Sequence, residues 1–454
     1  MNSQWLTCSE SIETEYLQCM DEGRDVRKYE DDVKTITSMF HKGHTMEPEA
    51  HALWTKLQNA PIRPDYKYTE PSDLTEIRAC RCMSKHKDKD MIPDKPDLYR
   101  FVYGAWLGRC SGCLFGQPVE GWYRDRIVGM MKDTDNYPPK RYFSSKIGTV
   151  LREKYRVKDE GHVYGSNTIN WINNVKYGPE DDDTNYTILN LKTVEEHGKG
   201  FTSDEMAESW LMNLQFLHAC TAERIAYRNF TNLILPPYSA VYENAYREWI
   251  GAQIRADLFG YISPGDPEAA AALAWKDASI SHTRNGIYGE MLFAAMIARA
   301  AVSKDILDVI DAGLGEIPEH SRLFEAVEIV VSWYKDEKLT YENCLERIHT
   351  RYNEKISHDW CHTISNAMIC MVGLLWGNMD FEKTIGICVS AGFDTDCNAA
   401  TTGSVVGMML GSDSLPAMWI TPLHDTIKSG IDGFGMMSIS GLAERMVKLA
   451  YENN

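Results

Sequence analysis

Two acidic clusters stand far apart in this chain, and each opens a stretch with the periodicity of a helix. Two bare carboxylates about 4 Å apart repel by roughly 4 kcal/mol at an effective dielectric near 20, so a fold that gathers several of them needs cations. Ligand sets made only of oxygen favour hard divalent ions such as Mg²⁺, Mn²⁺ or Ca²⁺ over zinc. The sequence therefore predicts a carboxylate-bound metal site, whose ligands are Asp181, Asp182, Asp183, Asp394 and Asp396.

Three other acidic motifs fit the sequence less well. A calcium loop that began at Asp394 would need glycine at its sixth position and glutamate at its twelfth, where the chain has Ala399 and Val405. A phosphatase of the haloacid dehalogenase type has its Asp-x-Asp motif near the start of an α/β domain, whereas this one lies near the end of a helical region. A prenyl-diphosphate enzyme uses Asp-Asp-x-x-Asp, and a reading from Asp181 puts Asn185 at the last position.

Helices are predicted to position the clusters, because strand-like alternation is scarce. Hydrophobic periodicity of 3.6 residues is typical of amphipathic helices. It predicts helices over 184–197, 204–219, 267–280, 285–302, 322–335, 341–350, 362–376, 380–391 and 397–410. A proline-rich break at 92–96 divides the chain into a mostly helical N-terminal extension of unassigned role, residues 1–95, and a catalytic domain, residues 96–454. The predicted fold is an all-α globule.

Glycines recur every four residues in two of the helical segments, at 104, 108, 112 and 116 and again at 403, 407 and 411. Each glycine inside a helix costs about 1 kcal/mol relative to alanine. Residues four apart share one helix face, so the cost is offset only where two backbones approach closely. These glycine ridges are therefore expected to be buried and to bring the two ends of the catalytic domain together.

Composition excludes several classes of protein. The net charge of −18 argues against a protein that wraps nucleic acid, which normally carries a basic surface. No apolar run reaches the roughly 20 residues needed to span a bilayer, and the N-terminus lacks a signal-peptide pattern. Twelve cysteines without such a signal favour free thiols in the cytoplasm. Cys80-x-Cys82 and Cys110-x-x-Cys113 each lack the second pair that a zinc site would need.

Four motifs in order resemble those of the ADP-ribosylglycohydrolase family, over roughly residues 98–450. The segment 104–120 resembles its Gly-Ala-x-x-Gly … Gly-x-Pro-x-Glu opening, and 182–184 matches its Asp-Asp-Thr motif. The segment 277–282 is similar to its Asp-Ala-x-x-Thr-His motif, and 392–400 to its late Gly-x-Asp-Thr-Asp-x-Asn-Ala motif.

The resemblance implies two Mg²⁺ ions, with Mn²⁺ or Ca²⁺ as alternatives, held by Asp182, Asp183, Asp394 and Asp396. Glu120 falls at a glutamate position beside the metals and is the leading general acid or base, although it and an acidic metal ligand such as Asp183 could exchange roles. Asp181 and Cys397 stand where the family usually has threonine ligands, and Cys113 where it often has aspartate. Asp181 still offers an oxygen, whereas sulfur is a poor ligand for magnesium.

Four further residues are candidates for substrate binding. The segment 251–255 resembles the family's Gly-x-x-x-Arg loop, which implies that Gly251 and Arg255 approach the phosphates of ADP-ribose. His282 falls at the motif histidine near the substrate, with a hydrogen-bonded core histidine as the alternative. Phe393, between Gly392 and Asp394, could stack on a base or a ribose, or pack in the core.

The predicted function is hydrolysis of a ribosyl N- or O-glycosidic bond in an ADP-ribosylated protein or small molecule, with release of ADP-ribose. One alternative is an N-glycosidase that acts on a smaller ribosylated metabolite or nucleoside. The other is a catalytically silent member that binds ADP-ribose or has a structural role, which the altered positions Asp181, Cys113 and Cys397 suggest. The sequence does not indicate an oligomeric state.

Overall fold

A computed structural model describes residues 4–163 and 166–452, and its described part is all-α apart from two short hairpins. The N-terminal extension contains α1 (Cys8–Asp21), α2 (Glu30–His41), α3 (Glu47–Gln58) and α4 (Leu74–Cys80). The helices that follow are α5 (Lys95–Gly116), α6 (Arg124–Asp133), α7 (Thr149–Lys154), α8 (Asp182–His197), α9 (Ser203–Asn213), α10 (Ala222–Thr231), α11 (Asp257–Tyr261), α12 (Pro267–Ala278), α13 (Asn285–Ala300), α14 (Ile306–Leu314), α15 (Arg322–Lys335), α16 (Tyr341–Arg351), α17 (Ser357–Cys361), α18 (Thr363–Gly377), α19 (Phe381–Ser390), α20 (Thr395–Leu410), α21 (Ala417–Ile420) and α22 (Ile439–Tyr451). The hairpins pair β1 (Glu160–Val163) with β2 (Ser166–Thr168) and β3 (Thr426–Lys428) with β4 (Met436–Ser438).

The all-α prediction is confirmed, and eight of the nine predicted helices begin and end within two residues of their predicted bounds. The exception is the helix predicted over 204–219, because α9 ends at Asn213. Leu214 takes an extended conformation and buries its side chain, and Phe216–His218 then forms a separate 3-10 turn. The apolar pattern thus continues past the end of the helix, because Leu214 is buried from an extended conformation.

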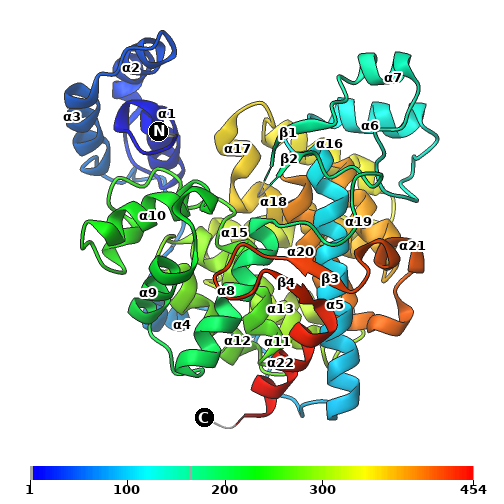
Figure 1. The fold of residues 1–454 in the computed structure, drawn as a ribbon. Coiled ribbons are helices and arrows are strands. Elements are labelled where there is room, and N and C mark those ends of the chain that lie inside the picture. Colours follow the sequence, from blue (N-terminus) through cyan, green and yellow to red (C-terminus); the bar gives the residue numbers. More distant parts are fainter. Residues whose placement is uncertain (1–3, 164–165, 453–454) are drawn as a thin grey trace.

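The two glycine ridges pack against each other along α5 and α20, as the sequence predicted (Figure 1). A Cβ atom at Gly108 would lie 2.1 Å from the carbonyl oxygen of Gly403, and one at Gly112 would lie 2.1 Å from that of Ala399. The contacts run in opposite chain directions, from Gly104 beside Gly407 to Gly116 beside Asp396. Only glycine allows main chains to approach this closely, so the ridge fixes where α20 begins relative to the end of α5.

The hydroxyl of Thr395, the first residue of α20, donates to the carbonyl oxygen of Gly116, the last residue of α5, at 3.0 Å. The chain then makes a 3-10 turn, Gln117–Val119, and reaches Glu120. The end of α5 and the start of α20 therefore bring residues near 120 and near 395 to the same place.

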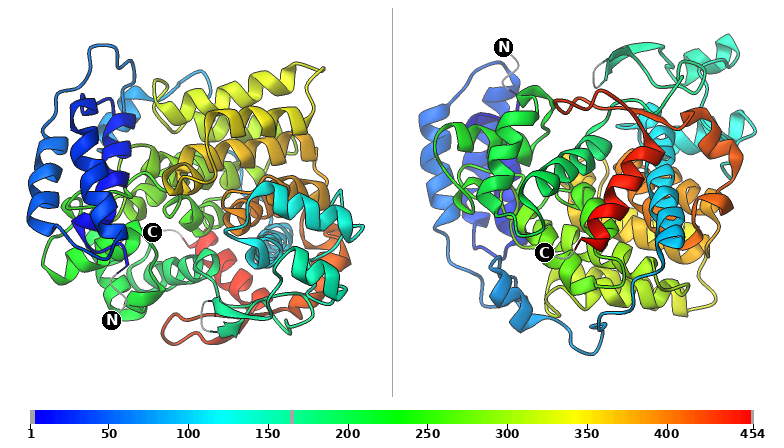
Figure 2. Two further views of the ribbon diagram at one scale, coloured as in Figure 1. Left: turned by 90° about the horizontal axis from the view of Figure 1, so that it is seen from above. Right: turned by 60° about the horizontal axis from the view of Figure 1, so that its bottom comes forward.

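The first three helices of the N-terminal extension, α1 to α3, lie together on one flank of the molecule beside α10, and α4 lies apart from them (Figures 1 and 2). The apolar side chains of the extension, among them Ile12, Trp54 and Ile77, belong to the same hydrophobic core as the rest of the chain. Buried ion pairs cross the contact as well, since Arg247 bridges Glu15 and Glu22 at 2.6 and 2.7 Å. The extension is thus packed as an integral layer, while its role stays unassigned.

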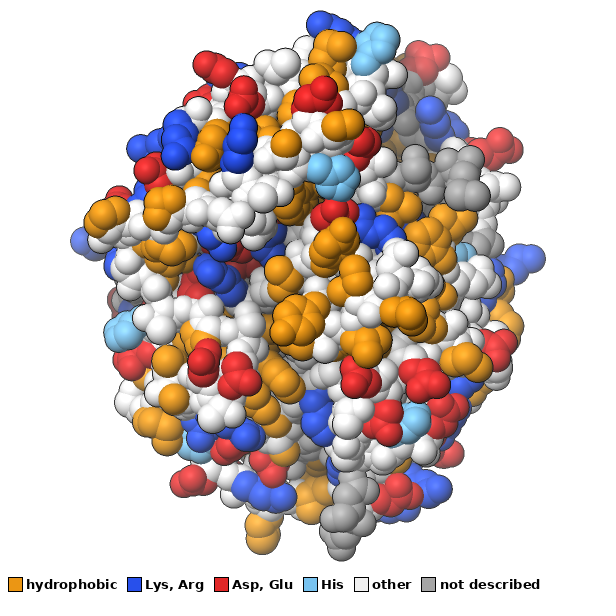
Figure 3. Space-filling model, turned by 90° about the vertical axis from the view of Figure 1, so that its left-hand side faces the viewer, with side chains coloured by type: hydrophobic (Ala, Val, Ile, Leu, Met, Phe, Trp, Pro, Cys, Tyr) orange, Lys and Arg blue, Asp and Glu red, His pale blue; other side chains and the backbone are white. Residues whose placement is uncertain are grey.

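The surface agrees with the mixed charge composition. On the face in Figure 3, acidic and basic side chains are interspersed, and several hydrophobic side chains gather near the middle of the face. Within the described residues, no helix combines the length and the apolar character that a membrane crossing requires.

Candidate metal centre

The two acidic clusters meet in space. Possible ligand atoms of Asp183, Asp396 and Cys397 all lie within 4.8 Å of one another, and so do those of Glu120, Asp394 and Asp396. A third set, Cys113, Asp181 and Asp183, meets the same limit. We refer to the carboxylates of these sets, together with Asp182 between Asp181 and Asp183, as the acidic centre. It comprises Glu120, Asp181, Asp182, Asp183, Asp394 and Asp396.

Two helix N-termini supply most of the acidic centre. Asp181 is the N-cap of α8, and its carboxylate accepts from the main-chain N–H of Asp183 at 3.0 Å. Asp394 is the N-cap of α20, and Asp396 lies in its first turn. Carboxylates are favoured at such positions because the helix dipole leaves partial positive charge there, although each helix end accounts for only about 0.3–1 kcal/mol. That is less than the repulsion among so many acids, so the dipoles alone do not explain the cluster.

Three carboxylate oxygens of the acidic centre are buried and have no hydrogen-bond partner within the described part of the chain: Asp183 Oδ2, Asp394 Oδ1 and Asp396 Oδ1. An unpaired buried carboxylate oxygen is costly, and native proteins rarely leave one without a partner. The three oxygens come from both clusters and from groups that lie together. This donor set fits a hard divalent cation, which prefers carboxylate oxygens.

Three carboxyl groups of the acidic centre, those of Asp182, Asp183 and Asp396, also have a raised pKa when no cation is present. Burial, then repulsion from neighbouring carboxylates, raises the pKa of Asp182 and Asp396 well above that of an ordinary aspartate. The same causes raise the pKa of Asp183 well above its usual value, even though Arg109 lies beside it. Cations would remove this repulsion, so the arrangement is suited to ion binding and unfavourable without it.

Glu120 differs from its neighbours in being exposed. Partial loss of hydration, then repulsion from Asp394 and Asp181, nevertheless raises the pKa of Glu120 well above that of a free glutamate. Asp182 is half-buried, whereas Asp181, Asp183, Asp394 and Asp396 are buried. The acidic centre therefore opens to solvent on the side of Glu120 and Asp182. A carboxyl group that faces solvent and has a raised pKa can act as a general acid.

Arg109 is a residue of this site that sequence reasoning missed. It is fully buried on α5, and its Nε donates to the main-chain oxygen of Asp183 at 2.6 Å while Nη2 donates to Asp183 Oδ1 at 3.1 Å. Its Nη1 donates to Asp257 at 2.7 Å. Arg109 therefore orients Asp183 so that only Oδ2 stays free. One feature of the sequence could have indicated this role. Arg109 lies between the glycines of a helix expected to be buried, and arginine is almost never fully buried unless it is paired.

Gln117 was missed as well. Its amide nitrogen donates to Asp181 Oδ2, and its amide oxygen accepts from Asn170 at 2.9 Å. The side chain thus holds Asp181 from the turn that follows α5. Nothing in the local sequence distinguishes this glutamine from an ordinary surface residue.

The two cysteines at altered positions stay protonated in the protein alone. Burial, then repulsion from Asp183, raises the pKa of Cys397 well above its usual value, and burial followed by Asp181 and Asp183 does the same for Cys113. Neutral thiols are weak ligands for a hard ion. The carboxylates are therefore the stronger donors of this site.

The predicted phosphate loop forms an internal salt-bridge cluster. Arg255 is fully buried, and its guanidinium donates to Asp277 at 2.6 Å and to Glu223 at 2.7 Å. Its remaining N–H groups face Gly251 O, Asp277 O and Ser281 Oγ. A Cβ atom at Gly251 would lie 2.0 Å from a Glu223 oxygen. Gly251 and Arg255 thus both pack against Glu223. All the N–H groups of Arg255 already have acceptors inside the protein, so it presents no free donor to a phosphate.

His282 and Phe393 are also internal. His282 is buried, shares a 2.8 Å hydrogen bond with Ser281 Oγ, and lies 4.0 Å from Glu223, which matches its alternative role as a core histidine. Phe393 is fully buried, with its ring centroid 4.9 Å from that of His349. Its φ of +56° belongs to the turn that leads into Asp394. The structure therefore gives Phe393 a packing role and leaves its ring no open face for stacking on a base.

The match to a known family covers the part of the chain that contains the acidic centre. The family model described as ADP-ribosylglycohydrolase matches residues 94–454. A solved structure described as an "ADP-ribosylglycohydrolase-related protein complex" is 15% identical, with a TM-score of 0.44, and the match covers 78% of this chain and 98% of that one. A search of the curated proteins finds no match.

Proposed function

Because the chain belongs to the ADP-ribosylglycohydrolase family, we propose that it is a metal-dependent glycosidase that hydrolyses a ribosyl N- or O-glycosidic bond and releases ADP-ribose. The substrate is an ADP-ribosylated protein or small molecule. The observation that carries the proposal is the set of three unpaired, buried carboxylate oxygens on Asp183, Asp394 and Asp396. Such oxygens are tolerated in a folded protein when a cation binds them.

The cation we propose is Mg²⁺, in up to two sites, with Mn²⁺ or Ca²⁺ as substitutes. Asp182, Asp183, Asp394 and Asp396 would hold it, with Asp181 as a further oxygen donor. When bound, such an ion orients ribose hydroxyls and water and lowers the pKa of the water. Arg109 and Gln117 keep the ligand carboxylates oriented through the contacts described above. Oriented ligands matter because loss of such a supporting contact typically costs 10–100-fold in metal affinity or activity.

Glu120 is the residue we propose for proton transfer. It is exposed, has a raised pKa, and has a ligand atom within 4.8 Å of ligand atoms of Asp394 and Asp396. Cleavage at ribose passes through an oxocarbenium-like state, in which the leaving group gains a proton and water loses one. Glu120 would donate the first proton and recover one from water, and Asp183 is the other candidate for this role.

A second candidate function is binding of ADP-ribose without catalysis. One observation favours it: Cys113 and Cys397 lie beside the acidic centre as neutral thiols, which are weak ligands for a hard ion. An N-glycosidase acting on a nucleoside or other smaller ribosylated metabolite is a further alternative. We also propose a cytoplasmic location, since all twelve cysteines are free thiols.

The test combines binding and turnover. Wild-type protein freed of metal is incubated with ADP-ribosyl arginine, ADP-ribosyl serine and plain nucleosides, with and without Mg²⁺, and free ADP-ribose is measured. We expect Mg²⁺-dependent release from an ADP-ribosyl conjugate and none from Asp183→Asn. Binding of ADP-ribose without any turnover would favour the silent member. Cleavage of nucleosides alone would favour the N-glycosidase, and full turnover by Asp183→Asn would refute the proposed site.

A further inference from the structure

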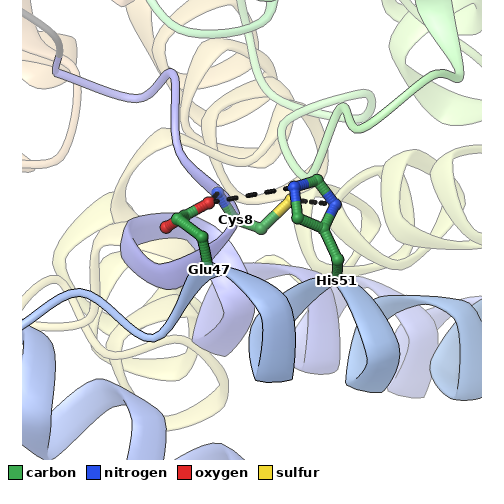
Figure 4. Close-up of side chains that lie close together, drawn as sticks. All are labelled: Cys8, Glu47 and His51. Carbon is green, nitrogen blue, oxygen red and sulfur yellow. Dashed lines mark hydrogen bonds and ion pairs between the residues drawn. The ribbon is translucent and has the colours of Figure 1, made fainter.

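A second cluster of possible metal ligands lies far from the acidic centre, where the N-terminal extension meets the rest of the chain. Cys8 comes from the start of α1, and Glu47 and His51 come from consecutive turns of α3 (Figure 4). Possible ligand atoms of these three residues all lie within 4.8 Å of one another. Glu243, from the segment after α10, adds a carboxylate oxygen 3.1 Å from His51 Nδ1.

Hydrogen bonding explains only part of this cluster. The Glu47 carboxylate accepts from the main-chain N–H groups of Cys8 and Ser9 at 3.1 and 2.9 Å and so caps α1. His51 Nδ1, however, faces two groups, Cys8 Sγ at 3.5 Å and Glu243 Oε1 at 3.1 Å. In a neutral imidazole this nitrogen either donates one hydrogen bond or accepts one. His51 Nδ1 can therefore form a hydrogen bond with Cys8 or with Glu243, but not with both. A metal ion between the three groups would contact all of them.

The histidine cluster at Asp21, His358 and His362 provides a contrast, because its ligand atoms are equally close. There, Trp249 Nε1 donates to His358 Nδ1 at 3.1 Å, and the main-chain N–H of Ile364 donates to His362 Nδ1 at 3.1 Å. An Nδ1 that accepts a hydrogen bond leaves the proton on Nε2, which then points at a carboxylate and cannot bind a metal. The Nδ1 hydrogen bonds there leave both histidines protonated on Nε2, although His362 Nε2 has no hydrogen-bond partner within the described residues. No such main-chain or tryptophan N–H fixes the tautomer of His51.

We propose that Cys8, His51, Glu47 and Glu243 form a binding site for a borderline divalent metal ion of the Zn²⁺ type. Zinc bond lengths of about 2.3 Å to sulfur and 2.0–2.1 Å to nitrogen place tetrahedral S and N ligands about 3.5 Å apart. The distance from Cys8 Sγ to His51 Nδ1 is 3.5 Å. Cysteine, histidine and carboxylate are together the usual zinc donors, whereas Mg²⁺ prefers oxygen alone.

The negative charge around the cluster also favours a bound cation. The carboxylates of Glu47 and Glu243 bring negative charge beside Cys8 and His51. Arg228 reaches the other oxygen of Glu243 at 3.5 Å and offsets only part of this charge. The side chain of His51 is 51% exposed, so an ion can enter from solvent. A bound ion would displace the thiol proton and link α1 and α3 to the segment that carries Glu243.

The probe is Co²⁺, because bonds between cobalt and thiolate absorb in the near ultraviolet and bonds to carboxylates alone do not. Full-length protein is freed of metal, saturated with Mg²⁺ to fill the acidic centre, and titrated with Co²⁺. We expect a charge-transfer band that saturates at one Co²⁺ per chain and is abolished by added Zn²⁺. The band is expected to disappear in Cys8→Ser and in His51→Asn, and to weaken in Glu243→Gln.

Two thiol controls locate the band. Cys80→Ser removes a half-exposed cysteine elsewhere in the extension, and Cys397→Ser removes the thiol beside the acidic centre. Both variants should keep the band. His51 is on the surface, so His51→Asn reports on the site even if Cys8→Ser does not fold. A wild-type protein without the band would overturn the proposal, as would a band that survives in His51→Asn or is lost only in Cys397→Ser.

Discussion

The guanidinium of Arg109 donates two hydrogen bonds to Asp183, one to the main-chain oxygen and one to Oδ1. Oδ2 is then the only oxygen of that carboxylate without a hydrogen-bond partner. The guanidinium and the carboxylate are both fully buried. The arginine comes from α5 and the aspartate from the first turn of α8, so one contact fixes a ligand carboxylate relative to the glycine ridge. Orientation of the metal ligands therefore depends on a residue that need not touch the metal.

The first prediction concerns Arg109→Lys. Lysine keeps the charge but lacks the planar fork that reaches Asp183 and Asp257 together. We expect Mg²⁺ affinity, measured by calorimetry, to fall about 10–100-fold, as is typical for loss of a ligand's supporting contact. The matched control is Arg255→Lys, which disturbs an equally buried salt-bridge cluster that involves no residue of the acidic centre. Both variants should lose stability, but equal losses of Mg²⁺ affinity would contradict the assignment.

The second prediction concerns pH. Burial and mutual repulsion raise the pKa of Asp183 and Asp396, so the metal-free centre holds protons that a cation must displace. Mg²⁺ affinity should therefore increase with pH. Calorimetry in two buffers of different ionisation enthalpy should reveal proton release, and fewer protons should be released in Asp396→Asn. Identical binding enthalpies in the two buffers would rule this out.

The same shifts determine how stability depends on pH. A raised native pKa contributes stability below the unfolded-state pKa of aspartate, and the contribution is lost as pH rises through the native pKa. The metal-free acidic centre should therefore contribute less to the melting temperature as pH rises from acidic to neutral. Saturating Mg²⁺ should reverse this trend, because it stabilises the native carboxylates in their charged form.

The third prediction concerns the glycine ridge. In Gly112→Ala the new methyl group would lie 2.1 Å from the carbonyl oxygen of Ala399, which is main chain and cannot rotate away. Overpacking costs about 1–3 kcal/mol or more, and the helix propensity of alanine returns only about 1 kcal/mol. We expect a net loss of about 1 kcal/mol, and up to about 2 kcal/mol, in denaturant unfolding. Gly200→Ala, with nothing within 4 Å of the added atom, is the control and should be close to neutral.

The fourth prediction concerns the docking of the N-terminal extension. Arg247→Met would leave Glu15 buried without its cation and Glu22 with Arg24 alone, and breaking a buried pair typically costs about 3–5 kcal/mol. Adding Glu15→Gln and Glu22→Gln to the same chain should recover much of that loss. For comparison, Arg445→Met removes an exposed pair with Glu195 and should change stability by less than about 1 kcal/mol. If the two arginine variants lose equal stability, the extension is not held by this network.

Local patterns were sufficient to predict most of the fold. The helix that became α15 was predicted with its observed bounds, 322–335, because its apolar residues repeat with a period of 3.6. The pairing of α5 with α20 followed from glycine spacing, since the cost of interior glycine requires a compensating close approach. The convergence of Asp183 with Asp396 followed from the chemistry of crowded carboxylates.

Residues whose roles depend on distant partners could not be predicted in this way. Arg109 and Gln117 support ligand carboxylates that are more than 60 residues away in sequence, and neither lies in an acidic motif. Arg255 was assigned to phosphate because of its loop, whereas Glu223 and Asp277 already occupy its donors. Local sequence reports charge and spacing, but not which buried partner a long side chain reaches.

The ridge between α5 and α20 also has a consequence for biosynthesis. Gly112 and Ala399 are brought into main-chain contact across nearly the whole catalytic region, so the groove along α5 stays uncovered until the ribosome has made α20. A nascent chain that stops before Thr395 lacks both Asp396 and the surface that shields those glycines. The acidic centre therefore cannot be completed until the last helices of the chain have been made.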